Sequence, residues 1–342
     1  MISPARAHAQ IGDKVSVEFT GAVNTTSADA KDPFVFLDAT ATVRLTDTID
    51  VVVRPYARRL PGGDWSKEMY QLQVRYQPDI ALPVRIDAGI ISSPLGIMTL
   101  EMRPDRNPVI GTPSYYFSPL PSFDGRSDRV QVLSGGYPLG AMASLSGRRW
   151  DVRAGVTDGT PARSRRMMSS ARPPARPQFV TGAGITPIDG LRIGAGFARG
   201  VYREPAPSTA TLPPVQEATA TVFNLEGEYA IGYTRFAGEW IRDNFETAST
   251  PAVARGLLLE AVRTITPRWY AAARATRTST PVFYSNTRTR TRRVASGAET
   301  TIGYRLSPEI TLKAGYQASR GYTAATWTHA AAVSCVFFKR WW

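Results

Sequence analysis

The sequence has almost no cysteine and no long apolar run. Cys335 is the only cysteine in 342 residues, which excludes an internal disulfide and any metal site built from several cysteines. No segment approaches the ~20 consecutive apolar residues that a membrane-spanning helix needs. A membrane β-barrel remains compatible with this composition, because its strands alternate apolar and polar residues and average to mildly polar.

Histidine and lysine are also scarce. The formal net charge of +13 therefore rests on arginine, which indicates anionic partners. No glycine-rich phosphate loop occurs, and neither a recognition helix nor an aromatic and basic stacking platform supports nucleic-acid binding. We expect no cofactor, no metal site and no nucleic-acid partner. The histidines and lysines are His8, His329, Lys14, Lys31, Lys67, Lys313 and Lys339.

The sequence does contain a repeated alternation of apolar and polar residues. Such a period of two is typical of β-strands with two different faces. In 35–45 the odd-numbered side chains are apolar, and in 69–77 the pattern places Tyr70 on the apolar face together with Leu72, Val74 and Tyr76. Proline and glycine are spread throughout, which disfavours long helices. We count about sixteen strands between 13 and 341, with fourteen or eighteen as alternatives because 126–147 could hold one strand or two.

The connections between the predicted strands alternate in length. Tight connections occur at 46–48, 147–149, 187–190 and 307–309, whereas longer polar ones include 93–136, 158–175 and 279–291. Short turns on one rim and long loops on the other are typical of an outer-membrane barrel. An even number of strands would place both termini on the short-turn, periplasmic side.

Charged residues occupy the polar face of most predicted strands. No small core could pair so many, and burying one uncompensated ion costs several kcal/mol. We therefore expect that face to be in water and the apolar face in lipid. A large soluble sandwich or propeller is the alternative. The predicted fold is all-β: a transmembrane antiparallel β-barrel of about sixteen strands, with long external loops and short periplasmic turns.

Both ends of the chain resemble sorting signals. Ala7-His8-Ala9 matches the small-residue pattern of a signal cleavage site, so 1–9 is interpreted as the tail of an export signal or a short disordered terminus. Residues 10–342 form a single predicted barrel domain. The aromatic end, Phe337 to Trp342, resembles the signal read by the outer-membrane barrel assembly machinery, although that pattern most often ends in Phe.

Two stretches resemble Gram-negative outer-membrane porins, and more specifically the phosphate-selective porin-like group. They are VRIDAGIISSPLG from Val84 to Gly96 and YPLGAMASLSGRRWDVRAGVTDG from Tyr137 to Gly159. The resemblance implies that the third external loop, 93–136, folds into the lumen and narrows it, and that the chain forms a homotrimer. The lysine-rich anion site of that group has no counterpart here, because lysines are so few.

Arginines on the polar strand faces are the candidates for lining the pore and selecting anions. A guanidinium is always charged and binds carboxylate or phosphate oxygens with paired N–H donors. Pairing with Asp38, Asp50 and Asp87, which would stiffen the lumen, is the alternative. The candidates are Arg44, Arg54, Arg58, Arg75, Arg85, Arg153, Arg192 and Arg274.

The third loop supplies the candidates for a constriction. Packing of this loop as an external lid is the alternative. The candidates are Glu101, Arg103, Asp105, Arg106, Tyr115, Tyr116, Asp124 and Asp128.

We interpret the chain as an outer-membrane porin for passive diffusion of small hydrophilic solutes, with a preference for anions such as phosphate. Outer-membrane lipid and the phosphates of lipopolysaccharide are expected partners, because two predicted loops, 163–176 and 288–293, are rich in arginine. These could equally be solvated charged loops. A non-conducting structural or adhesive barrel is the second interpretation, and a barrel enzyme built around His329 is the third.

Overall fold

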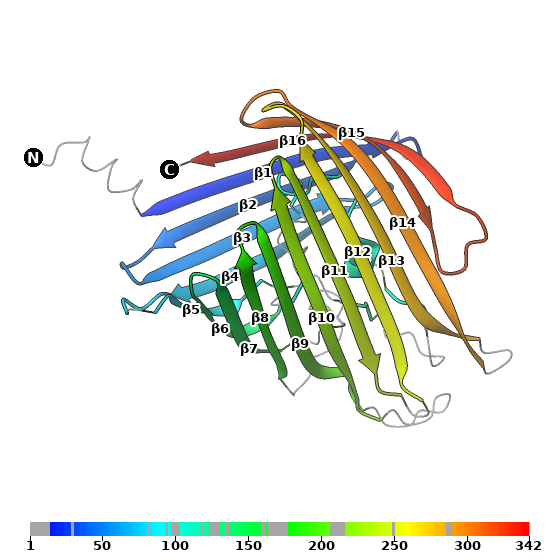
Figure 1. Cartoon of the computed structure of the whole chain (residues 1–342), viewed down its shortest axis with the longest axis horizontal. Helices are drawn as coiled ribbons and strands as arrows, with labels where there is room; N and C mark the ends of the chain where they lie inside the picture. Colours follow the sequence, from blue (N-terminus) through cyan, green and yellow to red (C-terminus); the bar gives the residue numbers. More distant parts are fainter. Residues whose placement is uncertain are drawn as a thin grey trace, which may run out of the picture.

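Sixteen antiparallel strands close into a barrel in which β1 pairs with β16 (Figure 1). The computed structural model describes residues 14–28, 31–80, 82–92, 95–96, 103–117, 119–122, 130–133, 137–158, 162, 177–205, 216–247, 250–284 and 289–341. A single turn of helix, α3 (Ser114–Phe117), lies between β5 and β6. The strands are β1 (Val15–Thr26), β2 (Phe34–Arg44), β3 (Ile49–Arg59), β4 (Trp65–Tyr76), β5 (Val84–Ile90), β6 (Leu139–Ser146), β7 (Trp150–Thr157), β8 (Gln178–Ile188), β9 (Leu191–Arg203), β10 (Ala218–Ile231), β11 (Thr234–Phe245), β12 (Ala252–Thr264), β13 (Trp269–Tyr284), β14 (Thr289–Arg305), β15 (Ile310–Arg320) and β16 (Thr328–Trp341).

The two rims of the barrel differ. The start of β1 and the end of β16 lie at one rim, here named the short-turn rim, with connections such as 189–190 and 232–233. The opposite, long-loop rim carries connections such as 91–138 and 158–177. Gly190 shows why one turn can be so tight, because its φ is 84° and a Cβ there would lie 2.4 Å from the carbonyl oxygen of Ala230.

Strand pairing between β13 and β14 runs further than the sequence predicted. Residues 279–291 were expected to form a loop, but β13 continues to Tyr284 and β14 begins at Thr289, with Thr280 opposite Arg293 and Val282 opposite Thr291. Threonine and valine favour extended backbone. Arg290, Arg292 and Arg293, interpreted as loop charges in the sequence, therefore lie on β14.

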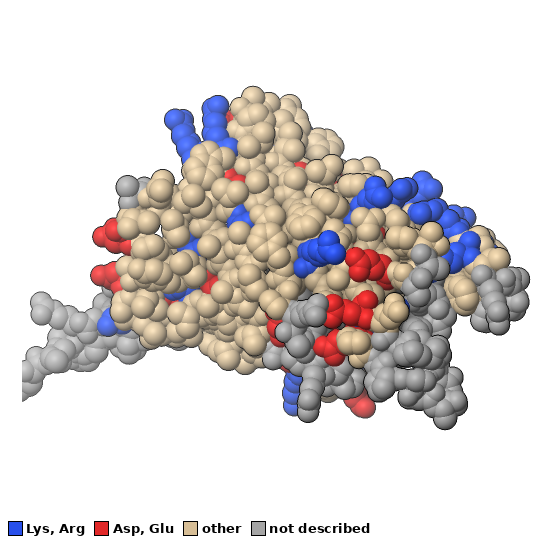
Figure 2. Space-filling model, turned by 90° about the horizontal axis from the view of Figure 1, so that it is seen from below, with Lys and Arg blue, Asp and Glu red and all other residues tan. Residues whose placement is uncertain are grey.

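The outer face of the barrel is apolar. Leu225, Leu259 and Ile302 are each more than half exposed, and no described part of the chain forms a second layer over them. Figure 2 shows a broad uncharged surface with charged side chains mostly toward its ends. This arrangement is the reverse of a soluble protein and matches a wall in contact with lipid. Exposed apolar residues of the strands include Val23, Leu37, Leu72, Val74, Ile86, Leu139, Val152, Val156, Phe179, Ile193, Phe223, Leu225, Phe236, Leu257, Leu259, Ile302, Leu312 and Val333.

Tyr70 lies on the face opposite to the predicted one. The pairing of β3 with β4 shifts by one residue between Arg54 and Pro55, so the alternation of β4 is interrupted at Tyr70. A bulge of this kind turns one extra side chain to the other face. The Tyr70 ring consequently lies inside the barrel, stacked on Tyr56 at 4.1 Å and on Tyr137 at 4.7 Å between centroids.

The interior is dry along the long-loop half of β8 to β12. In that half the inward side chains are mostly small or apolar, and Ala220, Val222 and Ile241 have no exposed surface. Residues of the 91–138 connection, here named loop 3, pack against them, including Tyr115, Tyr116 and Val132. The expectation that the whole inner face is wet is therefore wrong for this side, because loop 3 covers it. In the part of the chain that is described, no helix has the length and apolar character needed to cross a membrane.

A charge placed on the outer wall tests its contact with lipid. Leu225 and Ile231 are equally exposed, at 54%, on the same face of β10, but Leu225 is central and Ile231 ends the strand. In phospholipid vesicles, Leu225→Arg should lower the unfolding free energy by about 2–4 kcal/mol and Ile231→Arg by about 0–1 kcal/mol, because the penalty falls toward the interface. Equal losses in denaturant titrations would contradict a lipid-facing wall.

Candidate functional site

Loop 3 crosses the inside of the barrel and is bound to β1 at one end. Arg103 is 3.2 Å from Glu18 of β1 and donates from Nε to Asp105 at 2.8 Å. Thr20, also on β1, donates to the same Asp105 carboxylate at 3.0 Å. These contacts join residues 85 positions apart in the sequence, so they hold the beginning of the loop against the wall.

Lys313 of β15 binds the backbone of loop 3. Its Nζ donates to the carbonyl oxygens of Pro104 at 2.7 Å and of Asn107 at 2.5 Å, and the side chain is 5% exposed. An ammonium group has three donors and no acceptor, so carbonyl oxygens are suitable partners. The strand thereby satisfies backbone carbonyls that have no sheet or helix to pair with.

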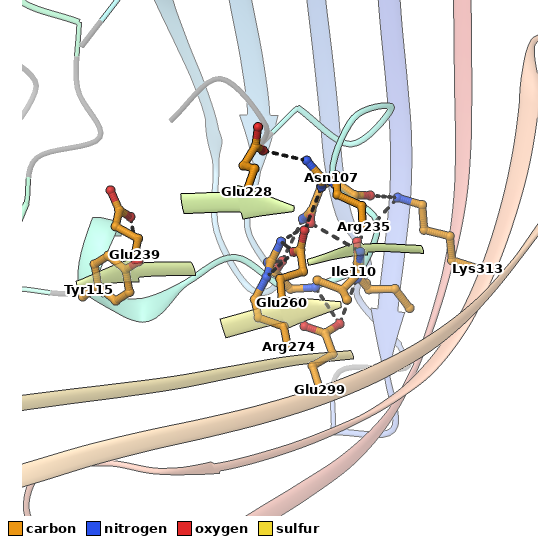
Figure 3. Close-up of polar contacts among 12 residues, drawn as sticks. Asn107, Ile110, Tyr115, Glu228, Arg235, Glu239, Glu260, Arg274, Glu299 and Lys313 are labelled. Atoms are coloured by element: carbon orange, nitrogen blue, oxygen red, sulfur yellow. Dashed lines mark hydrogen bonds and ion pairs between the residues drawn. The ribbon is translucent and has the colours of Figure 1, made fainter. Parts of the chain in front are cut away.

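Glu299 of the neighbouring strand β14 binds the next residues of the same loop. The backbone N–H groups of Ile110 and Gly111 both donate to its Oε1 at 2.8 Å. Arg274 of β13 donates to the carbonyl oxygen of Gly111 at 3.0 Å and to Oδ1 of Asn107 at 2.7 Å (Figure 3). Side chains of the wall thus bind both the backbone N–H groups and the backbone carbonyl oxygens of loop 3.

The helical turn α3 is bound to β11. The hydroxyls of Tyr115 and Tyr116 donate to Oε2 of Glu239 at 2.9 and 2.6 Å, and all three side chains are buried. Burial, and next the charge of Glu239, raise the pKa of the Tyr115 hydroxyl well above its ordinary value, so the hydroxyl keeps the proton that it donates. The two tyrosines belong to the buried apolar cluster between loop 3 and β8 to β12.

Cavities remain where loop 3 does not pack against the wall, and described residues of loop 3 line each of them. Toward the short-turn rim, a cavity of about 1050 Å³ is lined by Gly96 and Arg106 of the loop and by inward residues of β5 to β11. Toward the long-loop rim, one of about 500 Å³ lies between loop 3 and β1 to β4, and one of about 400 Å³ lies against β13 to β15. Toward the long-loop rim, the open space of the lumen is therefore displaced away from β8 to β12.

Most of the candidate pore arginines have acidic partners. Arg54 is bound to Asp38 at 2.8 Å, and both are almost fully buried. Arg75 and Arg85 share Asp87, at 3.0 and 2.9 Å. These inward ion pairs stiffen the wall of β2 to β5, and the Asp87 group keeps one net positive charge.

Arg44 and the arginines of the far wall are paired as well. Arg44 is 3.8 Å from Asp50, near the short-turn rim. Arg192 bonds Asp151 at 3.0 Å and Glu226 at 2.7 Å, and Arg153 is 3.6 Å from the same Glu226. Arg274 bonds Glu260 of β12 at 2.5 Å.

Arg58 and Arg106 differ from these residues. Arg58 of β3 lines the cavity toward the long-loop rim, 6.0 Å from the centroid of the Tyr56 ring, and Arg106 is exposed where loop 3 lines the larger cavity. Within the described ranges neither guanidinium has an acidic partner. Both charges are therefore available to a solute.

The predicted constriction residues lie partly within loop 3 as described. Arg103 and Arg106 line the cavities, Asp105 binds Arg103 and Thr20, and Tyr115 and Tyr116 belong to the buried apolar cluster. The remaining candidates, Glu101, Asp124 and Asp128, lie outside the described residues, as do residues 1–9.

Sequence reasoning did not select four residues of this site. Lys313 and Glu299 fall on the polar faces of their predicted strands, but the sequence gives no sign of which loop they meet. Arg235 and Glu260, which are 2.9 Å apart, were overlooked. The alternation in 252–265 is weak, so the side to which Glu260 points was uncertain.

His329 lies away from the lumen. It is exposed on β16, at the same face as Val333, and its Nδ1 is 2.6 Å from the hydroxyl of Tyr316, which is also exposed. Among the described residues, no three His, Cys, Asp or Glu side chains converge on a point that could hold a metal ion.

Removing the Glu299 carboxylate tests how loop 3 is held. Glu299→Ala leaves two backbone N–H groups without their charged acceptor, each contact being worth about 1.5–3 kcal/mol. We expect the amides of Ile110 and Gly111 to exchange hydrogen at least tenfold faster, as measured by mass spectrometry. Asp79→Ala, an exposed carboxylate in the β4–β5 turn, is the matched control. Unchanged protection at these amides would contradict the role of Glu299.

Comparison with solved structures finds outer-membrane barrels. The chain matches outer-membrane expressed OmpT of Vibrio cholerae with a TM-score of 0.61 and 12% identity, covering 95% of this chain and 97% of that one. An anion-selective porin from Comamonas acidovorans gives 0.59 and 10%, covering 96% and 100%, and the outer membrane channel DcaP of Acinetobacter baumannii gives 0.57 and 9%, covering 96% of each chain. No family model and no curated protein sequence matches. The chain has the fold of outer-membrane porins, a closed barrel of sixteen antiparallel strands.

Proposed function

We propose that this chain is a porin of the Gram-negative outer membrane, which lets small hydrophilic solutes diffuse passively and prefers anions. The observation that carries the proposal is the cavity of about 1050 Å³ beside loop 3. Five arginines and three carboxylates line it, which leaves two more positive than negative charges. They are Arg85, Arg106, Arg153, Arg192, Arg235, Asp151, Glu226 and Glu228.

Two further observations support this location and this preference. The outer face is apolar, as contact with lipid requires, and the solved barrels of the same fold include an anion-selective porin. An anion would meet the unpaired Arg58 and Arg106 on opposite sides of loop 3. Several weak sites in sequence permit passage without trapping the solute.

A non-conducting barrel is the second candidate function. The packing of loop 3 on β8 to β12 favours it, because this dry side removes a large part of the cross-section from the path of solutes. The cavities that loop 3 leaves open favour conduction. The third interpretation, an enzyme built around His329, is weakened by the position of this residue on the outer face beside Tyr316, where it has no acidic partner among the described residues.

Planar bilayers distinguish the channel from the silent barrel. Purified protein under a tenfold KCl gradient should give ohmic current steps. The reversal potential should have the sign of the chloride equilibrium potential. Arg58→Gln with Arg106→Gln removes the two unpaired lumen charges, so the chloride-to-potassium permeability ratio should fall by about 2–3-fold while the steps persist. Arg255→Gln with Arg263→Gln, equal in charge but on the outer face of β12, should leave the ratio unchanged.

Each outcome of this experiment has a distinct meaning. Absence of steps from correctly folded protein would favour the non-conducting barrel. Steps whose selectivity is the same in the Arg58 and Arg106 variant would keep the channel but remove these two residues from its selectivity.

We also propose that the chain forms a homotrimer, and the support for this is the short length of three neighbouring strands. The strands β5, β6 and β7 have 7, 8 and 8 residues, whereas a strand that spans a bilayer needs about 9–11. If lipid covered these short strands, hydrocarbon would contact backbone N–H and C=O groups beyond the strand ends that have no partner. We infer that β5 to β7 face other copies of the chain rather than lipid.

Cysteine cross-linking tests this contact surface. Ala141 on β6 and Ala275 on β13 are both exposed alanines on the outer face. In a Cys335→Ser background, Ala141→Cys should form a disulfide between copies in native membranes, and Ala275→Cys should not. Equal cross-linking at the two positions, or none at Ala141→Cys, would contradict an interface at β5 to β7.

A further inference from the structure

Two arginines on the outer face lie directly opposite each other on neighbouring strands. Arg242 of β11 is paired in register with Arg255 of β12, and both side chains are exposed. The next residue of β11, Asp243, is fully buried, so Arg242 points away from the interior. Like charges in directly opposed positions destabilise a sheet. An anion bound between the two guanidiniums would offset this repulsion.

A third arginine completes the cluster. Arg277 of β13 is exposed and lies opposite Leu257, two positions along β12 from Arg255. Diagonal neighbours of this kind are about 7–8 Å apart. Among the residues that the structure describes, none of the three guanidiniums has an acidic partner, although Arg242 donates to the amide oxygen of Asn244 at 3.2 Å.

The height of the cluster in the wall is set by the strand geometry. Trp269 and Tyr304, with ring centroids 4.6 Å apart, mark the apolar boundary at the short-turn rim. Residues 269 to 277 rise by ~3.3 Å each, which at a tilt of 35–45° gives about 20 Å along the membrane normal. Because the apolar band is about 25 Å tall, the arginines lie close to its far boundary.

Apolar side chains adjoin the arginines on the side of the membrane centre. Leu257 lies between Trp240 and Arg277 in the register, and Leu259 follows two residues closer to the short-turn rim. Both leucines are exposed, at 38% and 56%. Figure 2 shows basic side chains gathered toward one end of the outer surface, next to the uncharged band. A ligand that contacts both parts needs an anionic head and apolar chains.

We propose that Arg242, Arg255 and Arg277 bind the phosphate groups of a phosphorylated glycolipid in the outer leaflet, with its acyl chains on Leu257 and Leu259. A phosphate oxygen pair accepts two N–H donors from one guanidinium, so two opposed arginines can share one phosphate. The long-loop rim faces the outer leaflet if both termini are periplasmic. The inference rests on the membrane location in the proposed function, but not on conduction.

Native mass spectrometry in detergent tests this site with defined lipids. The probes are bisphosphorylated lipid A, the same lipid with both phosphates removed, and phosphatidylglycerol. The test variant carries Arg242→Gln, Arg255→Gln and Arg277→Gln. The control carries Arg148→Gln, Arg263→Gln and Arg268→Gln, which remove three exposed arginines at the short-turn rim. Bilayer conductance of both variants shows separately whether the channel proposal stands.

Wild type and control should bind the bisphosphorylated lipid at least tenfold more tightly than the other two lipids. The test variant should lose roughly 100-fold in affinity, since each arginine near a lipid phosphate contributes about fivefold. Without lipid, the test variant should be at least as heat-stable as wild type, because a like-charge contact is removed.

Other results would overturn the proposal. Undiminished lipid A binding by the test variant would do so, as would equal binding of the dephosphorylated lipid or of phosphatidylglycerol. A loss of heat stability in the lipid-free variant would indicate that the arginines bind groups within the barrel. Oligomers that dissociate only in the test variant would assign this face to a second copy.

Discussion

The lumen depends on charged side chains of the wall that bind the backbone of loop 3. A chain segment that crosses the inside of a barrel has no neighbouring strand with which to pair its N–H and C=O groups, and leaving them unpaired is costly. The Lys313 ammonium donates to carbonyl oxygens of the loop, and the Glu299 carboxylate accepts from its N–H groups. Because both lie on adjacent strands, the loop is fixed against β14 and β15, and the open cavities are those that the fixed loop leaves.

Charge inside the barrel is therefore mostly structural. Arg54, Arg192 and Arg274 are bound to carboxylates, and only a small positive excess faces the water of the cavities. An excess of this size attracts anions without binding them tightly, since an unpaired guanidinium in water holds a solute far more weakly than one in a dry site. The selectivity proposed for the pore thus comes from the few charges that the scaffold does not use, Arg58 and Arg106.

Sequence alternation predicted the strands because the outward side chains that contact lipid are apolar. The same alternation could not separate the dry side of the interior from the wet side, since an inward alanine such as Ala220 reads like any small residue until loop 3 covers it. Tyr70 was misplaced because a one-residue bulge leaves no mark on composition. The binding of Ile110 to Glu299 joins residues 189 positions apart, so no local pattern could indicate it.

The lengths of the strands give the barrel two different outer walls. The strands β5 to β7 are too short to span the hydrocarbon, whereas β13 and β14, with 16 and 17 residues, extend beyond it (Figure 1). In the proposed assembly another copy of the chain covers the short wall, and the long wall reaches the headgroups. Opposed arginines such as Arg242 and Arg255 would be unfavourable on the short wall, where hydrocarbon or apolar protein faces the strands. On the long wall the headgroup layer supplies counter-charge, so the same repulsion becomes a site for phosphate.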